Sequence, residues 1–179
     1  MTTQSKSYSL GMMDLLNNFK ILIEQVFEVC GLKYSQPKPE IESSEYQACS
    51  FKINSKTVQY RLAKITPTKN GQFVTIWKRA AKNPIQPYDS SDNIDLVVVT
   101  VKTKNHFGQF IFPKAALIKQ GVFSLNGKGG KQAIRVYPPW DKTESRQAEK
   151  TQNWQLEFFA EIPKNKSIDV EKFKSLYSA

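Results

Sequence analysis

The sequence contains very few of the residues that most often build metal and redox sites. One histidine, His106, and two cysteines, Cys30 and Cys49, occur in 179 residues. A single histidine excludes a histidine-rich metal centre, and the two cysteines lack the short spacing of a zinc site. A secreted domain of this size more often carries a disulfide framework, so we expect two buried thiols in a reducing cytoplasm.

Long apolar runs are also missing. No stretch approaches the roughly 18 apolar residues that identify a membrane-spanning helix. Residues 1–9 are polar and lack the apolar region of a signal peptide. The sequence therefore predicts a soluble, cytoplasmic protein with no membrane partner.

Complete catalytic motifs are absent as well. No serine lies in a Gly-x-Ser-x-Gly nucleophile elbow. The glycine-rich segment 126–131 (NGKGGK) precedes a predicted strand, whereas a P-loop ends in Gly-Lys-Ser/Thr and opens a helix. We therefore predict no catalytic residues, no metal ligands and no cofactor.

A metal-dependent nuclease is the enzymatic alternative that stays open. Such enzymes place acidic residues and a lysine on adjacent strands, where they hold Mg²⁺ and activate water. Asp89, Asp92 and Asp95 precede a predicted strand that ends in Lys102. In the restriction-type nuclease pattern an acidic residue belongs where Thr100 stands, so this arrangement lacks one carboxylate.

Positive charge, in contrast, is abundant. The chain has 26 lysines and arginines against 16 acidic residues, a net charge of +10, and 12% of its residues are aromatic. An excess of this size repels itself in a compact domain, and a polyanionic partner offsets that repulsion. Since the charge is interleaved with flat rings that can stack on bases, the composition favours nucleic acid over simple solubility.

The hydrophobic pattern predicts an α+β fold that is mainly β. Apolar residues recur at helical spacing from Asp14 to Cys30, and strand patterns begin near Tyr46. Residues 57–65 and 72–78 flank a turn rich in Pro, Asn and Gly, which predicts a hairpin. The segment 95–102 (DLVVVTVK) is nearly continuous in apolar residues, as expected of a strand buried on both faces.

Many short strands with few helices and no βαβ alternation indicate a mostly antiparallel, pseudobarrel-like barrel with peripheral helices. We predict one domain over residues 1–179. Its parts are an N-terminal helix at 10–31, a β-barrel core with helices at 46–162, and a C-terminal tail or helix at 163–179.

Basic and aromatic residues cluster near the predicted strand ends and turns. Phosphate contact needs mobile cationic tips, which loops provide, and base reading needs Arg, Asn or Gln side chains. Lys102 and Lys104 flank one further turn. The predicted nucleic-acid-binding residues are Arg61, Lys64, Lys69, Gln72, Trp77, Lys78, Arg79, Lys131 and Arg135.

Four segments, in this order along the chain, resemble the MepB family: YRLAKITPTKNGQFVTIWKR (60–79), GQFIFPKAALIKQGVFS (108–124), AIRVYPPWD (133–141) and KTQNWQLEFF (150–159). The resemblance runs from about Asp14 to Ile162. That family takes its name from its neighbourhood to a multidrug efflux system, and its biochemical role is poorly defined.

The family in turn resembles the DNA-binding pseudobarrel fold, which grips the major groove with strands and loops. The resemblance implies two arms, the hairpin around 66–72 and the loop that leads into Arg135. We therefore predict a non-enzymatic nucleic-acid-binding protein, with DNA, single- or double-stranded, as the expected partner. A ligand- or protein-binding module linked to multidrug efflux is the other alternative, and the sequence leaves the oligomeric state open.

Overall fold

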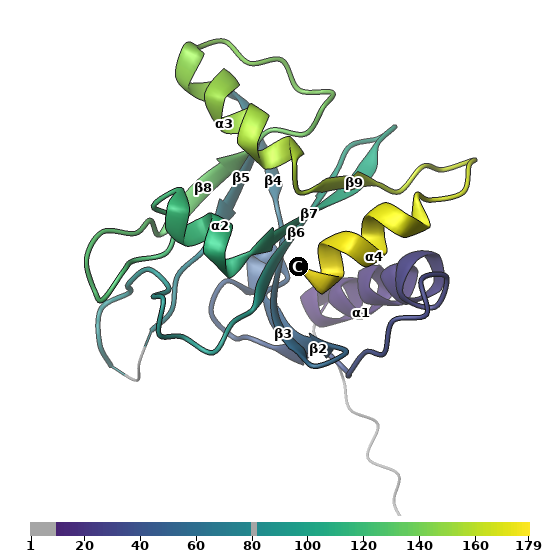
Figure 1. Ribbon diagram of the computed structural model, residues 1–179, viewed down its shortest axis with the longest axis horizontal. Helices are drawn as coiled ribbons and strands as arrows, with labels where there is room; N and C mark the ends of the chain where they lie inside the picture. The colour runs from purple at the N-terminus through teal and green to yellow at the C-terminus, as the bar shows by residue number, and fades with distance from the viewer. Residues whose placement is uncertain (1–9, 80–81) are drawn as a thin grey trace, which may run out of the picture.

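A six-stranded sheet forms the centre of the protein, with a three-stranded sheet beside it (Figure 1). The structure, a computed structural model, describes residues 10–79 and 82–179. Residues 1–9, on which the signal-peptide prediction depends, lie outside the described residues. No helix in the described ranges is long and apolar enough to cross a membrane.

The six-stranded sheet has the order β1-β2-β3-β6-β7-β9. Only β3 and β6 pair in parallel; the other neighbours are antiparallel. The strands are β1 (Lys38–Pro39), β2 (Cys49–Ile53), β3 (Lys56–Leu62), β6 (Leu96–Lys102), β7 (Phe107–Pro113) and β9 (Phe159–Glu161).

The three-stranded sheet has the order β4-β5-β8 and is antiparallel. Its strands are β4 (Lys64–Thr66), β5 (Lys69–Thr75) and β8 (Ala133–Val136). The predicted hairpin is confirmed as β4–β5. The predicted strand 57–65 is instead divided at Ala63, where the chain passes from the six-stranded sheet into the three-stranded one.

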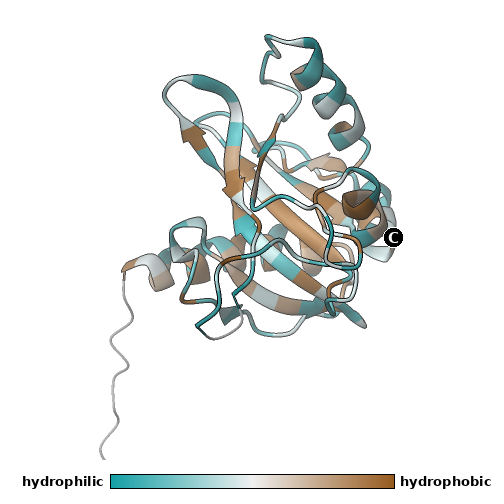
Figure 2. Cartoon of the chain, turned by 90° about the vertical axis from the view of Figure 1, so that its left-hand side faces the viewer, coloured by the Kyte–Doolittle hydropathy of each residue, from teal (hydrophilic) through white to brown (hydrophobic). Residues whose placement is uncertain are grey.

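Hydrophobic residues fill both faces of the six-stranded sheet, and Figure 2 shows them concentrated in the strands while the surrounding loops are largely hydrophilic. One face of the sheet packs against α1 (Leu10–Leu22), the π-helical turn η1 (Ile23–Phe27) and α4 (Val170–Ser178). The other face packs against α2 (Lys114–Lys119) and against apolar residues of β5 and β8.

Strand β6 shows why both faces fill. Leu96 and Val98 belong to the first cluster, and Val97, Val99 and Val101 to the second. Successive side chains of a strand point to opposite faces, so a continuous apolar run contributes to two cores. The prediction of a doubly buried strand at 95–102 is confirmed.

Two further helical elements complete the fold, the 3-10 turn η2 (Ser44–Tyr46) and α3 (Arg146–Leu156). The hydroxyl of Ser145 accepts a hydrogen bond from the amide of Ala148 at 3.1 Å and begins α3 as an N-cap. The α+β class is confirmed. The described residues form two open sheets and no closed barrel, so the barrel part of the prediction is not confirmed.

Both cysteines are buried and unpaired. Cys49 lies in β2 with no exposed surface, and burial raises the pKa of its thiol to about 12. A thiol with so high a pKa is protonated at neutral pH and a poor nucleophile.

Candidate nucleic-acid interface

The nine predicted binding residues do not share one surface. Strand β5 runs from Lys69, at the hairpin turn, toward Trp77, Lys78 and Arg79 beyond its other end. Because β8 is antiparallel to β5, Arg135 lies nearer the turn and Lys131 nearer the far end. The structure therefore places Lys69 and Arg135 toward one end of the three-stranded sheet, and Trp77, Lys78, Arg79 and Lys131 toward the other.

Three of the predicted cations are neutralised by the acidic segment, residues 40–45. Its carboxylates form three ion pairs: Glu40 with Arg61 at 2.9 Å, Glu42 with Arg79 at 2.9 Å, and Glu45 with Lys64 at 3.0 Å. These glutamates lie between β1 and β2 in the chain. Charges that face a bonded carboxylate are less available to a polyanion than free ones.

Arg61 is a correction to the predicted interface. Its side chain is 2% exposed. The guanidinium donates to the carbonyl of Tyr60 at 2.8 Å, to Glu40 at 2.9 Å and to the hydroxyl of Tyr88 at 3.2 Å. A buried arginine bonded on these sides cannot reach a phosphate, so Arg61 is a structural residue.

Gln72 is the second correction. It is 1% exposed, because it lies in β5 where the two sheets meet, and its amide nitrogen donates to the carbonyl of Lys102 at 3.4 Å. Reading a base edge requires an accessible amide, which Gln72 does not offer.

Of the other predicted residues near the far end of β5, Lys78 and Arg79 are engaged and Lys131 is not. Lys78 pairs with Asp92 at 2.6 Å, and the guanidinium of Arg79 lies 5.6 Å from the centre of the Trp77 ring. Trp77 is half-buried. Lys131 is exposed and has no acidic partner in residues 10–79 and 82–179.

Arg135 fastens the hairpin turn. One guanidinium nitrogen donates to the carbonyls of Asn70 (3.3 Å) and Gly71 (3.2 Å), and another donates to the hydroxyl of Thr66 at 2.8 Å. Gly71 has φ +76°, and a Cβ there would lie 2.6 Å from the Tyr137 ring, so only glycine fits this position. Arg135 therefore shapes the turn that presents Lys69.

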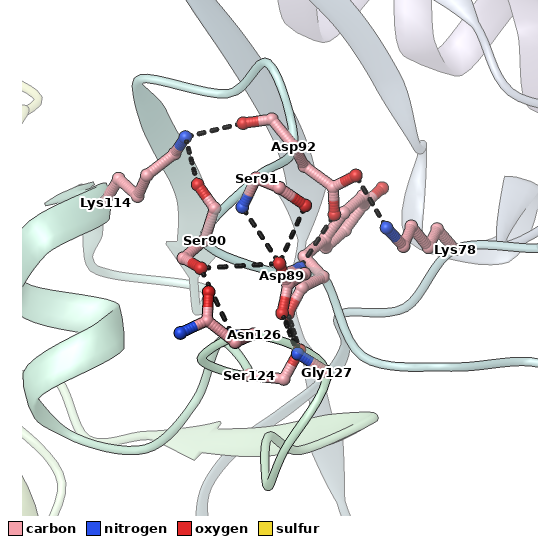
Figure 3. Close-up of polar contacts among 10 residues, drawn as sticks. Lys78, Asp89, Ser90, Ser91, Asp92, Lys114, Ser124, Asn126 and Gly127 are labelled. Carbon is pink, nitrogen blue, oxygen red and sulfur yellow. Dashed lines mark hydrogen bonds and ion pairs between the residues drawn. The ribbon is translucent and has the colours of Figure 1, made fainter.

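Asp89 and Asp92, two of the three aspartates of the nuclease alternative, are occupied by local hydrogen bonds (Figure 3). Asp89 accepts from the hydroxyl of Ser124 (2.7 Å) and the amide of Gly127 (2.8 Å), and also from Ser91. Among the described residues, no group of three His, Cys, Asp or Glu side chains is placed to hold a metal ion.

The two other aspartates also serve the fold. Asp92 pairs with Lys78 and accepts from the amide of Asp89 at 2.7 Å. Asp95 accepts from the amide of Thr57 at 2.7 Å, at the start of the β3–β6 pair. The buried hydroxyl of Thr100 accepts from Gln109 at 3.2 Å, so the position that lacks the nuclease carboxylate belongs to the core.

The hydrogen bonds to Asp89 predict that the protein loses stability in acid. Hydrogen bonds from Ser124, then from Ser91 and Gly127, hold the pKa of Asp89 well below its usual value. Because the pKa of Asp89 is lower in the folded than in the unfolded protein, its ionised carboxylate stabilises the fold fully above the unfolded pKa of about 3.9. This stabilisation is lost as the pH falls toward the folded pKa. We expect Asp89→Asn to lower the urea midpoint at pH 7 and to reduce the loss of stability between pH 5 and pH 3. An unchanged pH profile would contradict this role; Asp14→Asn, at an exposed position, is the control.

A different set of cations is free. We call it the loop rim: the β4–β5 turn (66–70), the β6–β7 turn (102–106), the loop 138–146 and residues 161–164. Its exposed cations, none with an acidic partner in the described ranges, are Lys69, Lys102, Lys104, Lys142, Arg146 and Lys164. The rim also carries Asp141, Glu144 and Glu161, so cations outnumber acids on it.

Side-chain contacts hold the parts of the rim together. Asn70 donates to Glu144 at 2.9 Å, which ties the hairpin turn to the loop 138–146. The ring of His106 stacks on Trp140 with centroids 4.6 Å apart and planes 11° apart, and its Nδ1 lies 3.5 Å from Glu161. Lys164 donates to the carbonyl of Lys104. Figure 1 shows the hairpin, α3 and the β6–β7 turn at the same end of the molecule.

The model of the MepB-like family matches residues 40–161, which hold both sheets' central strands and most of the rim. The chain belongs to the MepB-like family. A crystal structure of MepB superposes with a TM-score of 0.70 at 33% identity, covering 83% of this chain and 98% of that one. The predicted family is thereby confirmed.

A bacterial homing endonuclease matches more distantly, with a TM-score of 0.44 and 15% identity over 82% of this chain and 88% of that one. A TM-score this low is no guide to activity. No curated protein matches this MepB-like chain significantly.

Sequence reasoning found part of the rim in this MepB-like protein. It selected Lys69 as a contact and noted Lys102 and Lys104 at a turn. It did not select Lys142, in the loop before α3, Arg146, the first residue of α3, or Lys164, which follows β9. The signal available in the sequence was their position just outside predicted elements, but only the fold shows that these loops meet.

Proposed function

We propose that this MepB-like protein is a non-catalytic nucleic-acid-binding protein that holds the phosphate backbone with its loop rim. The observation that carries the proposal is that six exposed cations gather there without acidic partners among the described residues. Lysine and arginine tips on loops are the usual contacts of a phosphate backbone. The earlier set of Lys64, Lys78 and Arg79 contributes less, because each is paired with a carboxylate.

The stacked rings of His106 and Trp140 support the same ligand class. The side chain of His106, in the basic β6–β7 turn, is 44% exposed and stacks on Trp140 of the loop 138–146. A flat ring beside cations can stack on an unpaired base or on the end of a duplex. Single-stranded DNA is therefore included with duplex DNA as a ligand.

We further propose that the protein holds DNA in the way of the pseudobarrel fold. In that mode a hairpin and a loop act as two arms on either side of a DNA groove. The β4–β5 hairpin corresponds to the first arm. For the second arm we favour the β6–β7 turn over the loop before Arg135. Lys102 and Lys104 are exposed in that turn, and Lys102 is bonded to Gln72 of β5, whereas Lys131 lies nearer the far end of β5.

A salt titration of binding tests the proposal. The anisotropy of a labelled 20-base-pair duplex, of a 20-base single strand and of the matching RNA is measured against protein at 50 to 200 mM salt. Six phosphate contacts give an upper limit of about −5 for the slope of log affinity against log salt on duplex DNA. Binding that does not weaken with salt, or no binding at 50 mM, would overturn the electrostatic grip.

A further inference from the structure

Strand β8 forms one edge of the three-stranded sheet, and no strand of residues 10–79 or 82–179 pairs with its outer side. The amide of Ile76 donates to the carbonyl of Gln132 at 2.8 Å, and β8 continues in that register, with Val136 opposite Gln72. In an antiparallel pair the backbone groups of alternate residues point to the partner. Residues 132, 134 and 136 therefore bond to β5, whereas the backbone groups of residues 131, 133, 135 and 137 point outward.

The two ends of this outward edge are already satisfied. The amide of Lys131 donates to the carbonyl of Val122 at 2.8 Å. At the other end the buried side chain of Gln155 donates to the carbonyl of Arg135 and accepts from the amide of Tyr137, both at 2.9 Å. This pair of bonds is the one that a residue of a neighbouring strand would make, so the Gln155 amide replaces one residue of a missing strand.

The middle of the edge is open. The amide and carbonyl of Ala133 and the amide of Arg135 have no hydrogen-bond partner in the chain as far as the structure describes it. They border a cleft of about 380 Å³ between β8 and α3. Strands rise about 3.4 Å per residue, so residues 131–135 leave room for three or four residues of extended chain.

The side chains of the cleft define the ligand further. Lys131, which lines the cleft, is exposed and lacks an acidic partner among the described residues. Gln147 and Thr151 of α3 offer polar contacts on the opposite wall, and the half-buried Trp154 offers an apolar one. A ligand with a carboxylate near an apolar side chain complements these walls.

We propose that an extended acidic peptide of a partner protein binds in this cleft as a fourth strand beside β8. A peptide backbone fits the open edge because its N–H and C=O groups alternate with the spacing that Ala133 and Arg135 present. A phosphodiester backbone offers no hydrogen-bond donors of this kind, so the open edge favours a peptide over a nucleic acid. This site goes beyond nucleic-acid binding and does not depend on it.

The test uses a displayed library of random hexapeptides, selected on the full chain. Ala133→Pro removes the outward donor and places a ring in the cleft, while the ladder to β5 keeps its bonds, as edge strands allow. We expect enriched peptides to be acidic and to bind Ala133→Pro at least tenfold more weakly. On binding, the ¹⁵N-resolved amide signals of Ala133 and Arg135 should shift, and their hydrogen exchange should slow.

Controls separate this site from misfolding and from charge alone. Lys131→Glu should weaken the peptides, whereas Lys128→Glu, on the neighbouring loop and outside the cleft lining, should not. Ala133→Pro should leave duplex DNA binding unchanged. The proposal is overturned if no peptide is enriched, if enriched peptides bind Ala133→Pro equally, or if the amides of Ala133 and Arg135 do not respond.

Discussion

Replacing Lys102 and Lys104 together by glutamate should weaken duplex DNA binding by roughly 10- to 100-fold at 50 mM salt, because it removes two phosphate contacts and adds two repulsive charges. Both side chains are exposed at the β6–β7 turn and have no acidic partner among the described residues. The salt slope should fall by about 1.8 at the same time, since each phosphate contact contributes about 0.9. Anisotropy titrations of the two proteins over the same salt range measure both effects.

The matched control is Lys38→Glu with Lys52→Glu. These lysines are exposed on the paired strands β1 and β2, and Figure 1 shows β2 at the opposite end of the molecule from α3. The control changes the net charge by the same amount as the rim variant. Equal losses in the two double variants would mean that overall charge, rather than the loop rim, determines affinity.

Arg61→Leu should destabilise the protein by about 3 kcal/mol without changing the DNA affinity of the folded protein. Removing one partner of a buried ion pair leaves the other charge and its neighbouring acceptors unsatisfied, which costs about 3–5 kcal/mol. The low end applies here because Glu40 is 30% exposed and regains some water. Denaturant unfolding measures the loss, and anisotropy at low temperature measures the affinity.

Two further variants decide the interpretation of Arg61. Glu40→Gln with Arg61→Leu should recover part of the stability, since no buried charge is left alone. Arg79→Leu removes the more exposed pair with Glu42 and should cost no more than about 1 kcal/mol. If Arg61→Leu kept its stability and lost DNA affinity, Arg61 would return to the interface.

Local patterns predicted elements well in this chain. Alternation and turn chemistry located β5 and the hairpin, and a run of valines located β6, because these signals depend on neighbours in sequence. The pattern of residues 143–162 does not distinguish a helix from a strand, because it fits both. The structure has both in succession, α3 and then β9.

The interface was less predictable for a physical reason. Arg61 and Arg79 look like available cations until the acidic segment, some twenty to forty residues earlier, is folded onto them. A strand pattern states which side chains share a face but not what covers that face. The loop rim is hard to predict for the same reason: its loops are distant in sequence and become neighbours only through the order of the strands in the sheets.

The passage of the chain between sheets at Ala63 has a consequence for how the protein meets a ligand. Ala63 donates its amide to Thr100 at 3.0 Å, so β3, β4 and β6 are fastened together where the sheets divide. The two basic turns are thus the ends of strands anchored to one another, with Gln72 bonded to Lys102 between them. Two turns built in this way have little freedom to move apart. The conformational entropy lost on binding is therefore mainly that of the ligand. A flexible or bendable nucleic acid must adapt its shape to the protein.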